Sequence, residues 1–217
     1  ELGLGAGWMI TDYEQSGIPY DPPKVRVDRF EEAIQVIAGM FGDGPFSFEG
    51  EHYTIAGLDG QPAPATPGGP PLLIGGGGKR VLSIAARHAD IVGVNPNLKA
   101  GVIGPDAVLD ALAPSVDQKL EWVRQAAGDR FDDIELNVLS FIQDITDDSA
   151  GAAGVIAEMF GVSADEVLDV PAVLIGSIPE LTERLQARRE RWGFSYYVFQ
   201  ADAVDKMAPL VAELTGH

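Results

Sequence analysis

The sequence predicts an α/β protein whose strands form a parallel sheet. Strand, loop and helix patterns alternate about five times along the 217 residues, with no run of consecutive strands outside one hairpin. Leu72 to Ile74 is short and apolar throughout, which is typical of a parallel strand covered on both faces. Right-handed crossovers are therefore expected between the strands.

The N-terminal part predicts a strand, a loop and a helix. Leu2 to Leu4 is a short apolar strand. Residues 12–23 are expected to form a loop, because a glycine and several prolines interrupt them. From Asp28 to Phe41, apolar residues recur at three- and four-residue steps, which predicts a helix.

Residues 42–70 form a long excursion between that helix and the next strand. They are rich in glycine and proline, and the alternating segment FSFEGEHYTI predicts a small hairpin. Excursions of this length are usually functional lids or disordered, so this segment is a candidate lid.

The rest of the chain continues the alternation of strands and helices. A helix with Val81, Ile84, Ala85 and His88 on one face follows a run of glycines. Helix starts are predicted at Ser115 with Gln118, at Ser163 with Glu166, and at Ser177 with Pro179 and Glu180. The other predicted elements are strands at 91–94, 134–138, 172–175 and 196–199 and a final helix at 204–214.

Composition limits the possible partners and compartments. There are 15 Lys and Arg against 33 Asp and Glu, and a net charge of −18 argues against nucleic acid and anionic membranes as partners. No cysteine is present, so disulfides and thiolate metal sites are excluded. Neither a signal peptide nor a membrane span is indicated, and a cytoplasmic protein is expected. The sequence opens without methionine inside a strand pattern, from which we expect a missing N-terminal portion.

The segment PPLLIGGGGKR is the strongest candidate for a ligand site. Glycines at a strand's carboxyl end let backbone N–H groups approach an anion, aided by the dipole of the following helix. A Walker A loop fails because Leu73 and Arg80 replace its glycine and hydroxyl residues, and a Rossmann turn fails at Arg80. A phosphate cradle is therefore expected, and valine at Gly76 and Gly77 should weaken binding more than folding. The alternative is a turn that serves only tight helix–strand packing.

A second open strand end carries aromatic and acidic residues. Ala6, Gly7 and Trp8 follow the first strand, and Trp8 is equally compatible with the core and with a pocket wall for a flat ring. Tyr13 and Glu14 lie just beyond on the predicted loop, facing either a pocket or solvent.

No catalytic residue emerges from the sequence. The three histidines have no metal-ligand spacing, so no metal site is expected, and no G-x-S-x-G elbow is present. A place for an anionic ligand without an evident acid, base or nucleophile favours chemistry carried by a cofactor.

The motifs LGLGAGW, DYEQSGIPY, VRVDRFEEAIQVIAGMF, GEHYTI and PPLLIGGGGKRVLSIAARHADIVG occur in the order found in luciferase-like flavin and deazaflavin oxidoreductases. With IGSIPELTERLQARRERWGFSYYVF, they cover nearly the whole chain, which most closely resembles actinobacterial members that use coenzyme F420. The resemblance implies a (β/α)8 TIM barrel of the luciferase-like type, here a single N-terminally incomplete domain over 1–217. It also implies that residues 42–70 partly cover the pocket.

The resemblance further implies a coenzyme F420-dependent oxidoreductase that transfers a hydride to or from a small organic substrate, and a homodimer. The alternatives are an FMN-dependent two-component monooxygenase and a non-catalytic family member. The catalytic residue stays unassigned. The expected cofactor contacts are Gly5, Ala6, Gly7, Trp8, Tyr13 and Glu14 after the first strand, and Gly75, Gly76, Gly77, Gly78, Lys79 and Arg80 in the glycine run.

Overall fold

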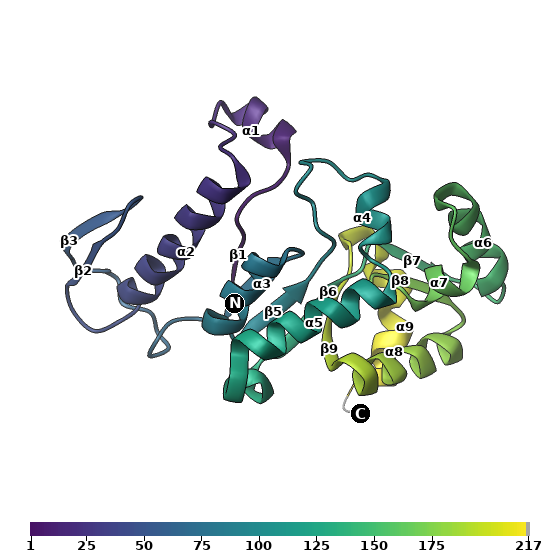
Figure 1. Ribbon diagram of the computed structural model, residues 1–217. Coiled ribbons are helices and arrows are strands. Elements are labelled where there is room, and N and C mark those ends of the chain that lie inside the picture. The colour runs from purple at the N-terminus through teal and green to yellow at the C-terminus, as the bar shows by residue number, and fades with distance from the viewer. Residues whose placement is uncertain (216–217) are drawn as a thin grey trace.

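A computed structural model describes residues 1–215 and contains a five-stranded parallel sheet as its centre (Figure 1). The strand order is β1-β4-β5-β6-β9, and each neighbouring pair is parallel. These strands are β1 (Leu2–Leu4), β4 (Leu72–Gly76), β5 (Ile91–Val94), β6 (Glu135–Leu139) and β9 (Phe194–Val198). The helices are α1 (Ile10–Ser16), α2 (Pro23–Met40), α3 (Lys79–His88), α4 (Pro105–Leu109), α5 (Ala113–Ala127), α6 (Ser149–Phe160), α7 (Ala164–Asp169), α8 (Ile178–Trp192) and α9 (Val204–Leu214).

One face of this sheet packs against helices and forms the main core. Ile74 of β4 and Val92 of β5 are fully buried against Leu82 of α3 and Leu120 of α5. Burying a side chain of this size stabilises the fold by about 1.5–3 kcal/mol. The side chains that β5 and β6 contribute to this core, Val92 with Val94 and Leu136 with Val138, lie two positions apart, as the period of two requires.

The opposite face carries small and polar residues. Strand register aligns Gly75, Gly93, Asn137 and Tyr196 in one row across four strands. The Tyr196 hydroxyl donates to the Glu1 carboxylate at 3.1 Å, although β1 and β9 are the two edges of the sheet. The sheet therefore curves as the wall of a barrel does.

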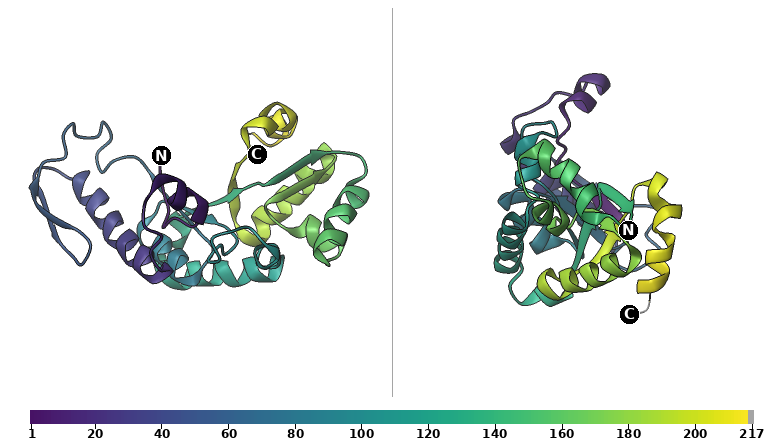
Figure 2. Two further views of the ribbon diagram at one scale, coloured as in Figure 1. Left: turned by 90° about the horizontal axis from the view of Figure 1, so that it is seen from above. Right: turned by 90° about the vertical axis from the view of Figure 1, so that its right-hand side faces the viewer.

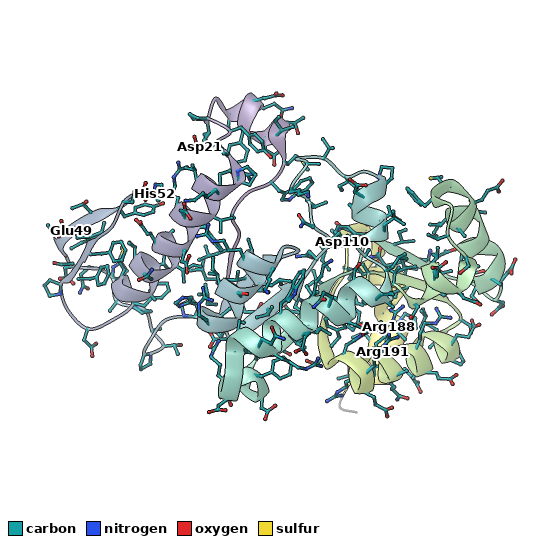
Figure 3. The ribbon with its side chains drawn as sticks, viewed as in Figure 1. Asp21, Glu49, His52, Asp110, Arg188 and Arg191 are labelled. Carbon is teal, nitrogen blue, oxygen red and sulfur yellow. The ribbon has the colours of Figure 1, made fainter. Side chains whose placement is uncertain are left out.

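A second parallel pair lies beyond this sheet and consists of β7 (Ile142–Ile145) and β8 (Val173–Gly176). The helices α6 and α7 pack on it with a small core of their own, and α8 and α9 enclose another. Arg188 of α8 is 2% exposed and donates to the carbonyls of Leu168 and Val170 at 2.7 and 2.9 Å (Figure 3). This buried cation therefore ties the segment after α7 to α8.

The predicted hairpin is confirmed as the antiparallel strands β2 (Phe46–Glu49) and β3 (Thr54–Leu58). The Glu32 carboxylate of α2 accepts hydrogen bonds from the backbone N–H groups of His52 and Tyr53 at 2.8 and 3.1 Å. Figure 1 and the left-hand view of Figure 2 show the hairpin on the side of α2 away from β1. The lid role of residues 42–70 thus stays a prediction that none of these contacts supports.

Most predicted elements are confirmed, and the errors have identifiable causes. Residues 12–16 belong to α1 and not to a loop, because the glycine and prolines that suggested the loop come later and Gly17 ends the helix with φ 69°. The helix predicted from Asp28 begins earlier, at Pro23, since proline suits the first turn. The helix start predicted at Ser115 is wrong, because α5 already begins at Ala113.

The helix α3 was predicted, but its core face differs from the prediction. Its buried side chains include Leu82, Ile84 and Ala85, whereas His88 is exposed and not on the core face.

Two other elements have no clear signal in the sequence. The strand β7 contains polar residues, and α6 contains glycines in its interior, which lowers helix propensity. These segments fold as they do because neighbouring elements pack on them.

Candidate functional site

The loops that follow β1, β4 and β5 meet at the carboxyl edge of the main sheet. The backbone N–H of Ile10, after β1, donates to the Gly101 carbonyl, after β5, at 3.2 Å. Gly77, after β4, lies against Pro96, after β5. In parallel α/β proteins ligands bind at this edge, so it is the candidate site.

The glycine run divides into positions with different roles. Gly75 and Gly76 are the last residues of β4 and not part of a loop. A Cβ added at Gly77 would lie 2.2 Å from the Pro96 carbonyl oxygen, so this glycine permits two backbones to approach closely. At Gly78 an added Cβ would meet only the side-chain amide of Asn97, at 3.5 Å. Packing therefore explains Gly77 but not Gly78.

Gly78 is the N-cap of α3, and this helix end has no side-chain cap. Its first turn contains no acidic residue, and it begins with Lys79 and Arg80. The partial positive charge and free N–H groups of such an end favour an anion. The side-chain nitrogen of Asn97 adds a donor nearby, since its oxygen accepts from the Lys99 N–H at 3.1 Å. The residues present fit a phosphate group.

Arg80 does not lie in this cradle. Its guanidinium pairs with Asp28 at 2.5 Å and with Glu31 at 3.3 Å, both on α2. Lys24 and Arg80 together hold the pKa of the Asp28 carboxyl below its usual range. Arg80 therefore joins α3 to α2, whereas Lys79 is exposed and has no ion-pair partner within residues 1–215.

The loop after β1 brings several predicted contact residues together. Gly5 is exposed, and Ala6 packs partly on the core. Gly7 has a φ of 71°, and a Cβ there would collide with the Tyr13 hydroxyl. Trp8 is half-buried, and its carbonyl accepts from the Tyr20 hydroxyl at 3.0 Å.

The exposed residue Glu14 lies with Tyr13 in α1, a helix that the sequence analysis did not predict. Gly7 and Tyr13 thus lie together at the sheet edge, with Trp8 in the same loop. Gly5 and Glu14 face solvent, and Ala6 packs on the main core.

Two buried cations at this edge were missed by the sequence analysis. Arg26 of α2 is 6% exposed and contacts the loop after β1. Lys119 of α5 is 1% exposed and pairs with the Asp110 carboxylate at 2.6 Å, and the same carboxylate accepts from the Asn97 N–H at 2.7 Å (Figure 3). Burial lowers the pKa of Lys119, and Asp110 partly opposes this. Each residue sits in an ordinary helix pattern, so no sequence signal marked it.

The described residues provide no evident metal site. Within residues 1–215 no group of three or more His, Asp or Glu side chains is placed to hold a metal ion. His88, at the end of α3, has a pKa lowered by partial desolvation of its ring and by Arg87, and it lies at the opposite end of the helix from Gly78. In the same residues no helix is long and apolar enough to cross a bilayer.

This chain resembles known proteins in both sequence and structure. Residues 1–103 match the family model of luciferase-like monooxygenases. An uncharacterised protein of Mycobacterium tuberculosis is 36% identical over 86 residues, 40% of this chain and 28% of that protein. Pyrimidine monooxygenase RutA of Escherichia coli is 31% identical over 168 residues, 76% of this chain and 42% of RutA. The chain thus spans less than half the length of these curated relatives.

Solved structures share the fold over nearly the whole chain. Monooxygenase RslO1 from Streptomyces bottropensis has a TM-score of 0.67 at 15% identity, covering 99% of this chain and 67% of RslO1. The coenzyme F420-dependent tetrahydromethanopterin reductase from Methanopyrus kandleri has a TM-score of 0.65 at 16% identity, covering 97% of this chain and 72% of the reductase. At these identities the similarity shows a common barrel-type fold. It does not show a common activity.

Proposed function

Since this chain is a member of the luciferase-like family, we propose that it is an oxidoreductase that transfers a hydride between coenzyme F420 and a small organic substrate. The observation that carries the proposal is the uncapped start of α3 at Gly78, which faces a strand edge where three loops meet. An anionic cofactor with a flat ring suits such an edge, because the phosphate and the ring need different surroundings.

The residues of the chain would divide this task. Gly78, Lys79 and Asn97 would hold the phosphate with backbone N–H groups, a positive charge and an amide donor. Gly7 and Trp8 would border the ring from the neighbouring loop. When bound, the deazaflavin itself supplies the hydride acceptor or donor. This chain then has to bind the cofactor, orient it and exclude water.

Titration of the purified protein tests the cofactor directly. Coenzyme F420 and FMN are each added while the fluorescence of their rings is followed. We expect saturable binding of F420 and weaker binding of FMN. If F420 does not bind, the proposal is wrong.

An FMN-dependent monooxygenase is the second candidate, and the similarity to RutA over 76% of this chain favours it. Its reduced flavin reacts with oxygen, whereas a deazaflavin carries out hydride transfer. Oxygen consumption in the presence of reduced FMN and a candidate substrate, such as a pyrimidine, separates the two. Consumption that depends on both FMN and the substrate would favour the monooxygenase.

The phosphate cradle is tested with two substitutions on the same helix. Lys79→Ala removes the charge beside Gly78, and we expect F420 to bind about three- to tenfold more weakly, the worth of one ordinary hydrogen bond, because Lys79 is exposed. Arg87→Ala is the matched control, because it removes the same charge at the far end of α3, where Arg87 pairs with Glu31 at 3.0 Å. Equal binding by the wild type and both variants would contradict the cradle.

A further inference from the structure

Arg26, near the start of α2, is buried and has no carboxylate partner among residues 1–215. Its guanidinium donates to the carbonyl of Gly7, to the carbonyl of Asp21 at 3.0 Å and to the Tyr20 hydroxyl at 3.3 Å. The side chain of Asp21 pairs instead with Arg29, at 2.5 Å. A buried charge must be compensated, and here backbone and hydroxyl oxygens do so.

Two aromatic rings complete the surroundings of this cation. The guanidinium carbon lies 4.4 Å from the centre of the Tyr20 ring and 5.9 Å from that of Tyr13. The two rings meet edge to face, with centroids 5.0 Å apart. Cation–π attraction is strengthened in such desolvated positions, so the planar guanidinium fixes both rings relative to Gly7.

The Arg26 contacts continue into the loop after β5. The Tyr20 hydroxyl, which accepts from Arg26, donates to the Trp8 carbonyl at 3.0 Å. A Cβ at Gly101, where φ is 78°, would lie 2.9 Å from that hydroxyl and 3.3 Å from the Trp8 carbonyl oxygen. A hydrogen-bonded path therefore leads from Arg26 through Tyr20 to Trp8, and Gly101 packs directly against its end.

We propose that Arg26 is the positioning residue that holds Gly7 and Trp8 at the ring side of the cofactor site. This inference rests on the proposed function. The hydrogen bonds of Arg26 go to Gly7, Tyr20 and Asp21. Gly77 and Gly78 instead lie against Pro96 and Asn97. Loss of Arg26 therefore affects recognition of the ring and leaves the contribution of the phosphate unchanged.

The test compares ligands with and without phosphate. Coenzyme F420 and its phosphate-free ribityl deazaflavin core are titrated into the wild type and Arg26→Ala, with FMN and riboflavin as the pair if the protein prefers flavin. We expect both ligands to lose affinity about tenfold, the worth of one hydrogen bond to a charged group. The ratio of the two dissociation constants should stay as in the wild type.

Arg29→Ala is the matched control, because Arg29 contacts the same Asp21 but is 40% exposed. It should bind both ligands as the wild type does. Tyr20→Phe, which removes only one hydroxyl from the path, should weaken both ligands by about threefold. This variant decides the matter if Arg26→Ala does not fold.

The solvent accessibility of Trp8 is measured separately from ligand affinity, because it reports the position of the loop. The emission of Trp8, taken as the difference between each protein and its Trp8→Phe counterpart, should be quenched more strongly by acrylamide in Arg26→Ala. Added guanidinium ion should restore both ligand affinity and the wild-type quenching. Unchanged ring affinity in a folded Arg26→Ala, or a changed phosphate ratio, overturns the inference. A wild type that binds no ring-containing ligand instead refutes the proposed function.

Discussion

Two strand-to-helix junctions in which the strand ends in glycine differ in the capping of the helix that follows. In the first, β4 ends in glycine and α3 begins after Gly78 with two basic residues and no side-chain cap. In the second, β8 ends at Gly176 and α8 begins after Ser177, whose N–H and hydroxyl both donate to the Glu180 carboxylate at 2.8 Å. The hydroxyl of Ser149 adds a third bond to that carboxylate at 3.0 Å.

The difference supports the proposal that the start of α3 takes an external anion. At α8 the chain supplies its own carboxylate, which satisfies the N-terminal backbone and matches the helix dipole. At α3 no acidic side chain takes this place in the first turn. A glycine before a helix is therefore not itself a sign of a ligand site, and the absence of an internal anion is the more informative feature.

The largest expected effect separates packing from binding within the glycine run. Gly77→Ala places a Cβ against the backbone at Pro96 and Asn97, at 2.2 and 2.5 Å, and should lower the free energy of unfolding by about 3 kcal/mol. Gly78→Ala meets only ordinary contact and should change stability by less than about 1 kcal/mol. Urea denaturation of both variants measures this.

This result would correct the expectation that valine at Gly76 and Gly77 mainly harms binding. Valine at Gly76 would also collide with Val81, because even a Cβ there lies 2.5 Å from its side chain. Equal stability of the Gly77→Ala and Gly78→Ala variants would mean that the β4–α3 junction is looser than described.

The second largest effect concerns the loop after β5, which lies against the start of α3. Lys119→Met removes the ammonium that holds Asp110, and thus loosens the backbone at Asn97. We expect a loss of about 2 kcal/mol in unfolding free energy, since Asp110 is partly solvated and keeps some compensation. Asp144 and Lys206 form an exposed pair of 2.7 Å, so Lys206→Met serves as a control with little effect.

Lys119 also predicts a pH dependence. Its folded pKa is lowered, so the unfolded chain binds its proton more tightly. This group therefore adds stability as pH rises from the lowered folded pKa toward the ordinary lysine value of about 10.4. Lys119→Met should lack that rise in denaturation measured at alkaline pH, and an unchanged profile would contradict the assignment.

The two junctions also show what a sequence can and cannot predict. The start of α8 at Ser177 was predicted and is confirmed, because caps act between residues three apart in the chain. The parallel pairing of the main sheet agrees with the prediction from the same local alternation. These features depend on near neighbours, and periodicity reveals them.

The residues that arrange the site depend on distant neighbours. Gly77 faces Pro96, and Arg26 faces Gly7, so neither role is visible from local spacing. Arg80 was predicted beside the phosphate because it is adjacent in sequence, yet it turns toward Asp28. Sequence therefore predicts where the edge of the sheet lies, whereas tertiary contacts determine which side chains lie at that edge.

The smallest effect tests whether Glu180 fills at α8 the place left open at α3. Hydrogen bonds from Ser177, and then from Ser149, lower the pKa of Glu180. A lowered carboxyl pKa contributes stability that is present above the ordinary glutamate value of about 4.3 and is lost as pH falls through the folded pKa. Glu180→Gln should thus lower the melting temperature at neutral pH, and the difference from wild type should shrink in acid.

Glu183→Gln, on the same helix beyond its first turn, is the control. A difference that persists in acid would mean that Glu180 acts through its shape and not through its charge, and the contrast between the two helix starts would lose its electrostatic basis.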